Sequence, residues 1–169
     1  MTAGGVVLAS ALPSISWASF PDEARELAMN NLNTGELLET CYFDGKRYLD
    51  DELEKLNEFC RDHRRNEVHP MDRRLFDQIS QIQKLIGTDA EVIVISGYRS
   101  PLTNASLRKG ASGVAKKSLH MEGKAIDFRL DGVKLSTVRD AAISLKAGGV
   151  GYYPSSNFVH IDTGAVRSW

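Results

Sequence analysis

The chain has 169 residues, of which 42% are hydrophobic and 25% are charged, and its formal net charge is -1. A chain of this size can bury roughly two thirds of its unfolded surface in one core, so we expect a single domain. Binding a phosphate backbone requires an excess of Lys and Arg, and this chain has none, which argues against nucleic acid as a partner.

The chain starts with an uncharged run, MTAGGVVLASALPSISWASFP. Pro13 and several serines interrupt it, so it is a poor candidate for a membrane span. Residues 16–18, Ser-Trp-Ala, form a small-x-small site after which a signal peptidase could cut. We therefore expect a signal peptide over 1–18, export, and no stable membrane insertion of the mature domain 19–169. No Lys or Arg precedes the run as a signal requires, so a buried element of a cytosolic protein is the alternative.

The segment 25–49 alternates short apolar stretches with the turn signals Asn33-Thr34-Gly35 and Asp44-Gly45. This pattern is typical of consecutive β-hairpins and predicts a small antiparallel sheet at the start of the mature domain. Cys41 and Cys60 could form one disulfide in an exported protein, but two buried free thiols explain the pair equally well.

Two helical patterns follow. Apolar residues at helical spacing predict a helix from about 51 to 65, with Asp50 or Asp51 as its cap. A second apolar stripe predicts a helix that begins near Asp72 and ends at Gly87.

The second half of the chain predicts strands as well as a helix. The β-branched run 91–96 is a predicted strand, followed by a loop and a polar, glycine-bearing segment at 103–117. Residues 124–130 alternate as a strand, and 135–147 form a predicted helix with Ser136 as cap and Gly148 as terminator. The pattern from 150 to 162 indicates a hairpin. We therefore expect one α+β domain, an antiparallel sheet with packed helices.

Two of the four histidines lie in or beside predicted strands. His63 and His69 stand among charged residues, as solvated surface histidines do. His120 and His160 instead are each followed by an aspartate on the same segment, Asp127 and Asp162.

Two imidazoles and one carboxylate, with a fourth position for water, are the ligand set of a hydrolytic zinc site, where the metal lowers the pKa of its water to about 7. His120, Asp127 and His160 would supply that set, with Gly123 permitting a tight reversal between the first two. Structural roles for the two histidines are the alternative.

Three segments resemble the zinc D-Ala-D-Ala peptidase family in order and spacing: SGYRS at 96–100, SLHMEGKAIDF at 118–128 and FVHIDTG at 158–164. The family pattern S-x-H-x-x-G-x-A-x-D is matched at each of its positions between Ser118 and Asp127. Further segments, among them NLNTGE, YFDGKRYL and AGGVGYYP, resemble the peptidoglycan-cleaving members of this family. The resemblance covers nearly the whole chain after the leader.

The resemblance implies the family's zinc-peptidase fold and a periplasmic zinc endopeptidase that cuts peptide cross-links of peptidoglycan. These are D-Ala to diaminopimelate links, with diaminopimelate to diaminopimelate links as a further possibility. It implies Zn²⁺ held by His120, Asp127 and His160. Arg99 would bind a substrate carboxylate or the developing oxyanion, with a structural ion pair as the alternative. Ser118 would orient a ligand or the substrate, unless it is only a turn hydroxyl.

Aromatic residues are candidates for a substrate groove. Tyr98, Tyr152 and Tyr153 could contact the glycan or the stem peptide, or pack in the core. We take Tyr153 as a substrate-binding candidate.

The general base departs from the family pattern. Many members carry Asp or Glu three residues before the last histidine, whereas this chain has Asn157. Asp162 is a candidate base by strand parity, or else a partner of a ligating imidazole, and Glu122 is a weaker candidate. Asn157 therefore makes a non-catalytic peptidoglycan-binding module with a zinc site one alternative function. A D,D-carboxypeptidase or dipeptidase is another.

Overall fold

The computed structural model describes residues 23–110 and 115–169. The predicted signal peptide and its cleavage site lie outside these residues. In the described part of the chain, one seven-stranded sheet has the strand order β2-β1-β3-β4-β6-β5-β7. Four of its six strand pairs are antiparallel, and the pairs β1–β3 and β5–β7 are parallel. The mixed α/β architecture agrees with the expected fold class, apart from these two parallel pairs.

The amino-terminal hairpin is part of this sheet. Strands β1 (Ala24–Asn31) and β2 (Leu37–Asp44) pair antiparallel across a turn in which Gly35 has a φ of 71°. Strand β1 also pairs with β3 (Val92–Ser96). The predicted antiparallel hairpin is therefore present, but it is part of the main sheet, because local turn signals cannot show what the free edge of a hairpin joins.

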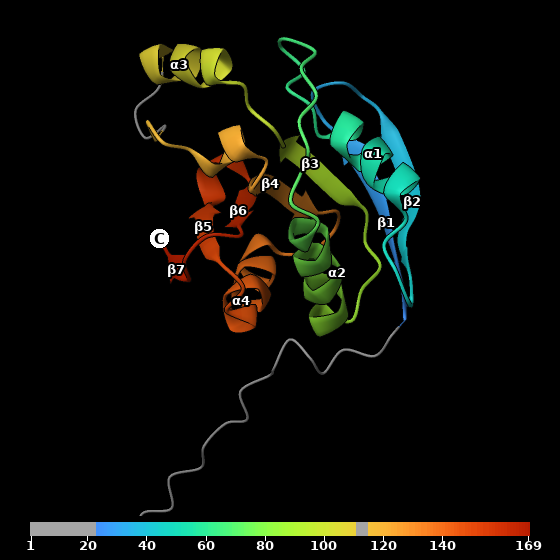
Figure 1. The fold of residues 1–169 in the computed structure, drawn as a ribbon. Coiled ribbons are helices and arrows are strands. Elements are labelled where there is room, and N and C mark those ends of the chain that lie inside the picture. The colour runs from blue at the N-terminus through green and yellow to red at the C-terminus, as the bar shows by residue number, and fades with distance from the viewer. Residues whose placement is uncertain (1–22, 111–114) are drawn as a thin grey trace, which may run out of the picture.

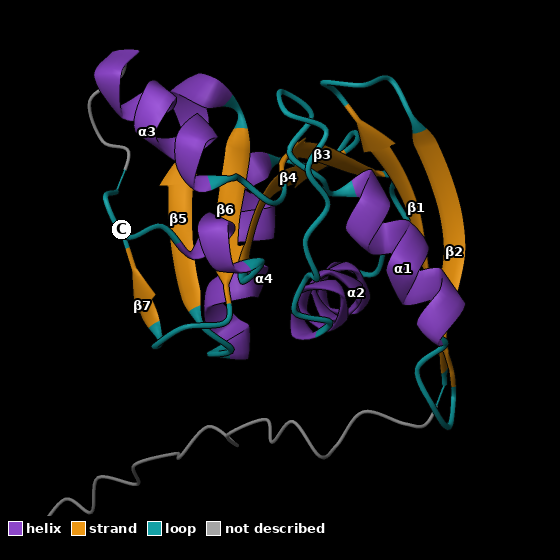
Figure 2. Cartoon of the chain, turned by 45° about the horizontal axis from the view of Figure 1, so that its top comes forward, coloured by secondary structure: helices purple, strands orange, loops and turns teal. Residues whose placement is uncertain are grey.

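Three helices pack on the sheet, and a fourth stands apart. Figures 1 and 2 show α1 (Asp50–Phe59), α2 (Arg74–Ile86) and α4 (Leu135–Leu145) gathered on one side of the curved sheet. The helix α3 (Pro101–Gly110) lies beyond the end of β3. The core fills the space between the three helices and the strands, and Phe76, Ile79, Ile126, Phe128 and Ile161 are all fully buried in it.

Several element ends differ from the sequence prediction. Helix α1 ends at Phe59 instead of about 65, because the chain turns at Asp62, whose backbone amide donates to the carbonyl of Glu67. The predicted side-chain caps of α1 and α4 are wrong, since Leu49 and Lys134 occupy the cap positions and make no side-chain cap bond. Gly87 caps the end of helix α2 as predicted, but α4 is capped by Lys146 and so ends ahead of Gly148.

The segment predicted as polar and irregular contains helix α3. Pro101 is its first residue, and the Ser100 hydroxyl accepts a hydrogen bond from the Thr103 amide at 3.2 Å. This is an N-cap followed by proline, a start signal that the sequence carries and that the prediction missed. Residues 111–114 lie outside the described part.

The carboxyl-terminal hairpin is confirmed. Strands β5 (Gly149–Tyr153) and β6 (Phe158–Asp162) pair antiparallel, and β6 also pairs with β4 (Ala125–Leu130). A two-residue strand β7 (Arg167–Ser168) completes the sheet beside β5. Among the described residues, no helix is both long and apolar enough to cross a membrane.

Candidate metal centre

Strand pairing brings an aspartate and a histidine together. Asp127 on β4 lies directly opposite His160 on β6. Their neighbours Ile126, Phe128 and Ile161 point into the core, and successive strand residues point to opposite faces. Asp127 and His160 therefore share the sheet face that is turned away from the core helices.

A short 3-10 helix, Leu119–Glu122, supplies the third group, His120. It ends at Gly123, whose φ of 64° is left-handed, and a Cβ at this position would overlap the carbonyl oxygen of Pro70. Only glycine fits there without strain, because it alone has no Cβ. The tight reversal expected after His120 is therefore present, and it leads straight into β4.

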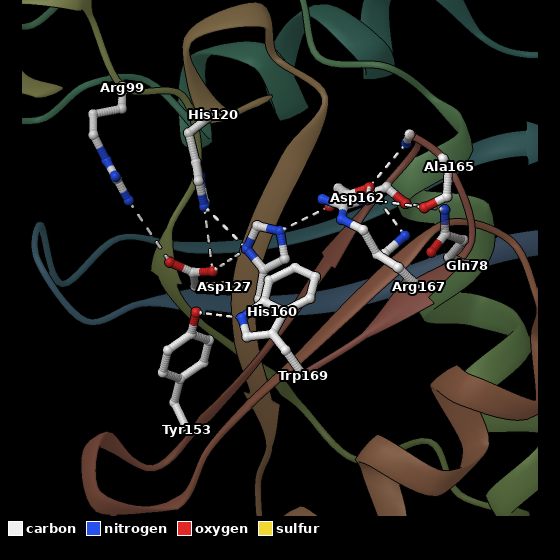
Figure 3. Close-up of polar contacts among 12 residues, drawn as sticks. Gln78, Arg99, His120, Asp127, Tyr153, His160, Asp162, Ala165, Arg167 and Trp169 are labelled. Carbon is white, nitrogen blue, oxygen red and sulfur yellow. Dashed lines mark hydrogen bonds and ion pairs between the residues drawn. The ribbon is translucent and has the colours of Figure 1, made fainter. Parts of the chain in front are cut away.

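One atom from each of His120, Asp127 and His160 lies within 4.8 Å of the other two. The His120 Nε2 atom is 3.3 Å from His160 Nδ1 and 3.3 Å from Asp127 Oδ1, and His160 Nδ1 is 2.8 Å from the same oxygen. Figure 3 shows these groups converging, with Asp162 and Arg167 on the far side of His160. The structure thus brings together the three predicted ligand residues.

The outward nitrogens of both rings are occupied. His120 Nδ1 lies 2.8 Å from the carbonyl oxygen of Gly97, which can only accept, so this nitrogen carries the proton. His160 Nε2 lies 3.1 Å from the buried carboxylate of Asp162. In neutral imidazoles these bonds leave the lone pairs of His120 Nε2 and His160 Nδ1 aimed at each other and at Asp127.

Three electron-pair donors that converge this closely need a cation between them. Burial lowers the pKa of His160, but hydrogen bonds to Asp127 and Asp162 outweigh it and raise this pKa to about 9. Burial raises the pKa of Asp127, but the two histidines more than offset it, so this pKa lies below its ordinary value. The cluster therefore favours positive charge at its centre, supplied by a proton or by a metal ion.

Asp162 is fully buried and its acceptor capacity is filled. Besides His160, it accepts hydrogen bonds from the amides of Gly149 and Gly164 and from both terminal nitrogens of Arg167. Burial by itself raises the pKa of Asp162, but these bonds outweigh it and hold the pKa well below its ordinary value. This environment suits a partner that orients the His160 ring better than it suits a proton acceptor.

Arg99 lies on the other side of Asp127. Its Nη2 atom is 3.8 Å from Asp127 Oδ2 and 3.3 Å from the Ser96 hydroxyl, and its Nη1 is 3.4 Å from Asn104 Oδ1. The backbone amide of Arg99 also donates to the carbonyl of His120 at 3.1 Å. Burial lowers the pKa of Arg99, with Asp127 opposing, yet a guanidinium remains charged in proteins.

These residues line a cleft of about 540 Å³. Ser118 and Tyr153, the two further substrate-binding candidates, both contribute to its wall. The lining also includes Lys117, Leu119, Phe158, Arg167 and Trp169. Of the lining side chains that the structure describes, only those of Asp127 and Asp162 carry a carboxyl group. A second hollow of about 580 Å³, beside β1, β2 and α2, contains no histidine among its lining residues.

Other candidates lie away from the cleft lining. Tyr98 stacks on His69 with ring centroids 4.6 Å apart, and Tyr152 lies under the guanidinium of Arg139. Glu122 pairs with Lys124 at the surface, and Asn157 has a left-handed φ of 54° in the β5–β6 connection. Both cysteines are free thiols.

The sequence predictions assigned no role to Arg167 or Trp169. The ring centroids of Trp169 and His160 lie 5.4 Å apart. The indole N–H of Trp169 donates to the Tyr153 hydroxyl at 2.7 Å. The contacts of Arg167 with Asp162 and of Trp169 with Tyr153 arise from strand pairing, so no sequence spacing could have predicted them. Their one sequence signal is that the ending Arg167-Ser168-Trp169 also resembles the peptidoglycan-cleaving members of the family.

Comparison with known proteins gives a family match. Residues 19–169 match the model of the family Peptidase_M15_2, described as "Peptidoglycan L,D-endopeptidase MepK". The chain is 52% identical over 169 residues to a protein of that name from Escherichia coli K12, and equally to one from Shigella flexneri, covering 98% of this chain and 92% of each relative. It is 47% identical over 173 residues to a Haemophilus influenzae protein named "Probable peptidoglycan L,D-endopeptidase MepK", covering 100% and 92%.

Proposed function

Because the chain belongs to the M15 metallopeptidase family of peptidoglycan L,D-endopeptidases, we propose that it is a zinc-dependent enzyme that hydrolyses peptide cross-links of peptidoglycan. The observation that carries this proposal is the convergence of His120 Nε2, His160 Nδ1 and Asp127 Oδ1, with both imidazole rings oriented by hydrogen bonds on their other nitrogens. These atoms belong to the lining of a cleft of about 540 Å³.

The donor set fits zinc. Ligand atoms about 2.0–2.2 Å from a tetrahedral zinc ion lie roughly 3.3–3.6 Å from one another. Two of the three separations are 3.3 Å, and the third, 2.8 Å between His160 and Asp127, is at hydrogen-bond distance. His120, Asp127 and His160, which all line the cleft, would hold the ion. When bound, zinc acts as a Lewis acid that activates water and polarises the scissile carbonyl.

The residues of the chain supply the remaining steps of binding and orientation. Arg99 points a cation at the metal centre from the Oδ2 side of Asp127 and would bind the substrate carbonyl oxygen as negative charge develops on it. Ser118 and Tyr153 offer hydroxyl groups to the peptide on the cleft wall. Asp162 orients His160 in this proposal and does not take the proton of water, because five hydrogen bonds already converge on its buried carboxylate.

The proposal concerns one bond in particular. A D-Ala to diaminopimelate link is a D,D bond, whereas a link between two diaminopimelate residues is an L,D bond. The resemblance in sequence placed the D,D link first. The relatives are named L,D-endopeptidases, which favours the diaminopimelate to diaminopimelate link as the preferred substrate of this chain.

Export of the mature domain completes the proposal. The family match begins at Ser19, the residue that follows the predicted cleavage site. A peptidoglycan substrate requires a location outside the cytoplasm, so we place the mature domain in the periplasm.

A second candidate function rests on the cleft chemistry. Asn157 stands where many members of the wider family carry a carboxylate, and both side-chain carboxylates in the described lining, Asp127 and Asp162, already contact a histidine. A module that binds peptidoglycan and zinc without turnover would have this appearance. Such a module would bind to purified sacculi and release no peptidoglycan fragments from them.

Digestion of purified muropeptide dimers separates these functions. Two dimers are compared, one joined through D-Ala to diaminopimelate and one through two diaminopimelate residues, and products are identified by chromatography and mass. We expect monomers from the second dimer, loss of cleavage with chelator, and recovery with zinc. Release of free D-Ala alone would indicate a carboxypeptidase instead.

A matched pair of histidine variants links cleavage to the site. His120→Ala should lose both zinc binding and cleavage. His63→Ala, a change of the same kind outside the cleft lining, should keep both. Full cleavage by His120→Ala would contradict the proposed site.

A further inference from the structure

The segment 167–169 runs along one wall of the cleft. Arg167 and Ser168 form strand β7 beside β5, and Trp169 exchanges two backbone hydrogen bonds with the same strand. The Trp169 amide donates to the Val150 carbonyl at 3.1 Å, and the Tyr152 amide donates to the Trp169 carbonyl at 3.0 Å. This pairing fixes the backbone from which the side chains of Arg167 and Trp169 reach the site.

Arg167 reaches the metal centre through Asp162. Its Nη1 donates to Asp162 Oδ1 at 3.1 Å and its Nη2 to Oδ2 at 2.6 Å, a two-point contact that sets the plane of the carboxylate. The same Oδ2 lies 3.1 Å from His160 Nε2. A Cβ at Gly149 would overlap both Arg167 and Asp162, so this glycine leaves the space that the contact needs.

Trp169 reaches the cleft through Tyr153. Its indole N–H donates to the Tyr153 oxygen at 2.7 Å, so the phenol acts as acceptor there and its own proton stays available to a substrate. A Cβ at Gly151 would overlap the rings of both Trp169 and Tyr153. The Tyr153 ring also stacks on Phe158 at 4.6 Å, which restricts the phenol from the other side.

We propose that Arg167 and Trp169 are positioning residues of this site. Arg167 holds Asp162, and Asp162 holds the His160 ring with Nδ1 toward the metal centre. Trp169 holds the Tyr153 hydroxyl so that it donates to a carbonyl or carboxylate oxygen of the cross-link peptide. The proposal rests on the proposed function, because it assigns both residues to a zinc site that binds peptide.

Zinc affinity tests the Arg167 part and needs no substrate. We expect Arg167→Gln to raise the zinc Kd, measured by competition with a chromogenic chelator, roughly ten- to a hundredfold, the usual loss when a residue that orients a ligand is removed. Arg167→Lys keeps the charge but not the two-point contact, so its zinc Kd should lie between those of the wild type and Arg167→Gln. Arg139→Gln, which removes an arginine packed over Tyr152 on the same strand, should leave the Kd unchanged.

An unchanged zinc Kd in folded Arg167→Gln would overturn this part. Thermal unfolding checks that the variants are folded. If Arg167→Gln does not fold, the zinc Kd of Arg167→Lys is the test, and an unchanged value there would overturn this part. Failure of the wild-type protein to cleave any dimer would contradict the proposed function and still leave the effect on zinc affinity measurable. The two failures are therefore distinguishable.

A kinetic comparison tests the Trp169 part. Trp169→Phe keeps a ring over His160 but loses the donor, so we expect kcat to fall about fivefold, the effect of one neutral hydrogen bond, with an unchanged zinc Kd. Tyr153→Phe should lower kcat at least as much, and adding Trp169→Phe to it should cause no further loss. Independent losses in the double variant, or an unchanged kcat in Trp169→Phe, would overturn this part, as would a wild-type protein without cleavage.

Discussion

The guanidinium of Arg99 lies 3.8 Å from Asp127, on the carboxylate oxygen that faces away from the two histidines. The other oxygen, Oδ1, contacts both rings. One buried carboxylate thus separates a permanent cation from the candidate metal centre, and both line the same cleft. The Arg99 guanidinium therefore lies beside the position that a metal ion would take, and not in it.

We expect Arg99→Gln to lower kcat/KM about 100- to 1000-fold, the range seen when a donor to developing negative charge is removed. The zinc Kd should change far less, because Arg99 contacts no ring nitrogen. Steady-state kinetics on the dimers and chelator competition check the two halves. A loss of zinc binding that matched the loss of cleavage would contradict this role for Arg99.

Asp62 anchors the loop that carries Arg99, and its side chain is almost fully buried. It accepts hydrogen bonds from the amides of Ser100 and Arg64. Burial raises the pKa of Asp62, but these bonds, with the hydroxyls of Thr103 and Ser100, outweigh it and lower the pKa. We expect Asp62→Asn to reduce the free energy of unfolding at pH 7 by about 1–3 kcal/mol.

The difference from wild type should depend on pH. Because the folded pKa of Asp62 is below the unfolded value of about 3.9, its contribution is present above about pH 4 and disappears as pH falls through the folded value. Denaturant titrations of wild type and Asp62→Asn should therefore converge below pH 4. Asp131→Asn, at an exposed turn, is the control, and a gap that widens on acidification would refute the assignment.

Two glycines with similar backbones separate strain from close contact. Gly123 and Gly132 have φ values of 64° and 68°, but a Cβ meets Pro70 at Gly123 and nothing within 4 Å at Gly132. Each alanine substitution should cost about 1–3 kcal/mol for the left-handed backbone, and Gly123→Ala should cost more and weaken zinc binding. Equal losses of stability and of zinc affinity in the two variants would contradict the packing argument.

Thiol labelling checks the cysteines. Burial raises the pKa of the Cys60 thiol to about 12, so it should not react with iodoacetamide at pH 8 in the folded protein, whereas the half-buried Cys41 should. Mass spectrometry should find one label on the folded protein and two after unfolding in urea without reductant. No label after unfolding would instead indicate the disulfide.

Much of the fold could be predicted from local pattern. The stripe of α2, its end at Gly87, the alternation of β4 and the β5–β6 hairpin are each encoded within a few adjacent residues. The end of α1 and the parallel contact of β1 with β3 could not be predicted, since both depend on distant partners. Helix α3 was missed although its Ser-Pro start is local.

The sequence by itself indicated which side chains could form the site, because the histidine and aspartate around Gly123 and the resemblance to the zinc D-Ala-D-Ala peptidase family together pointed to His120, Asp127 and His160. Only the tertiary structure decided how they are used. The choice of Nε2 on one ring and Nδ1 on the other follows from the Gly97 carbonyl and the Asp162 carboxylate, and Asp162 is in turn set by Arg167. Hydrogen bonds act over about 3 Å in space and not along the chain, so folding alone selects these partners.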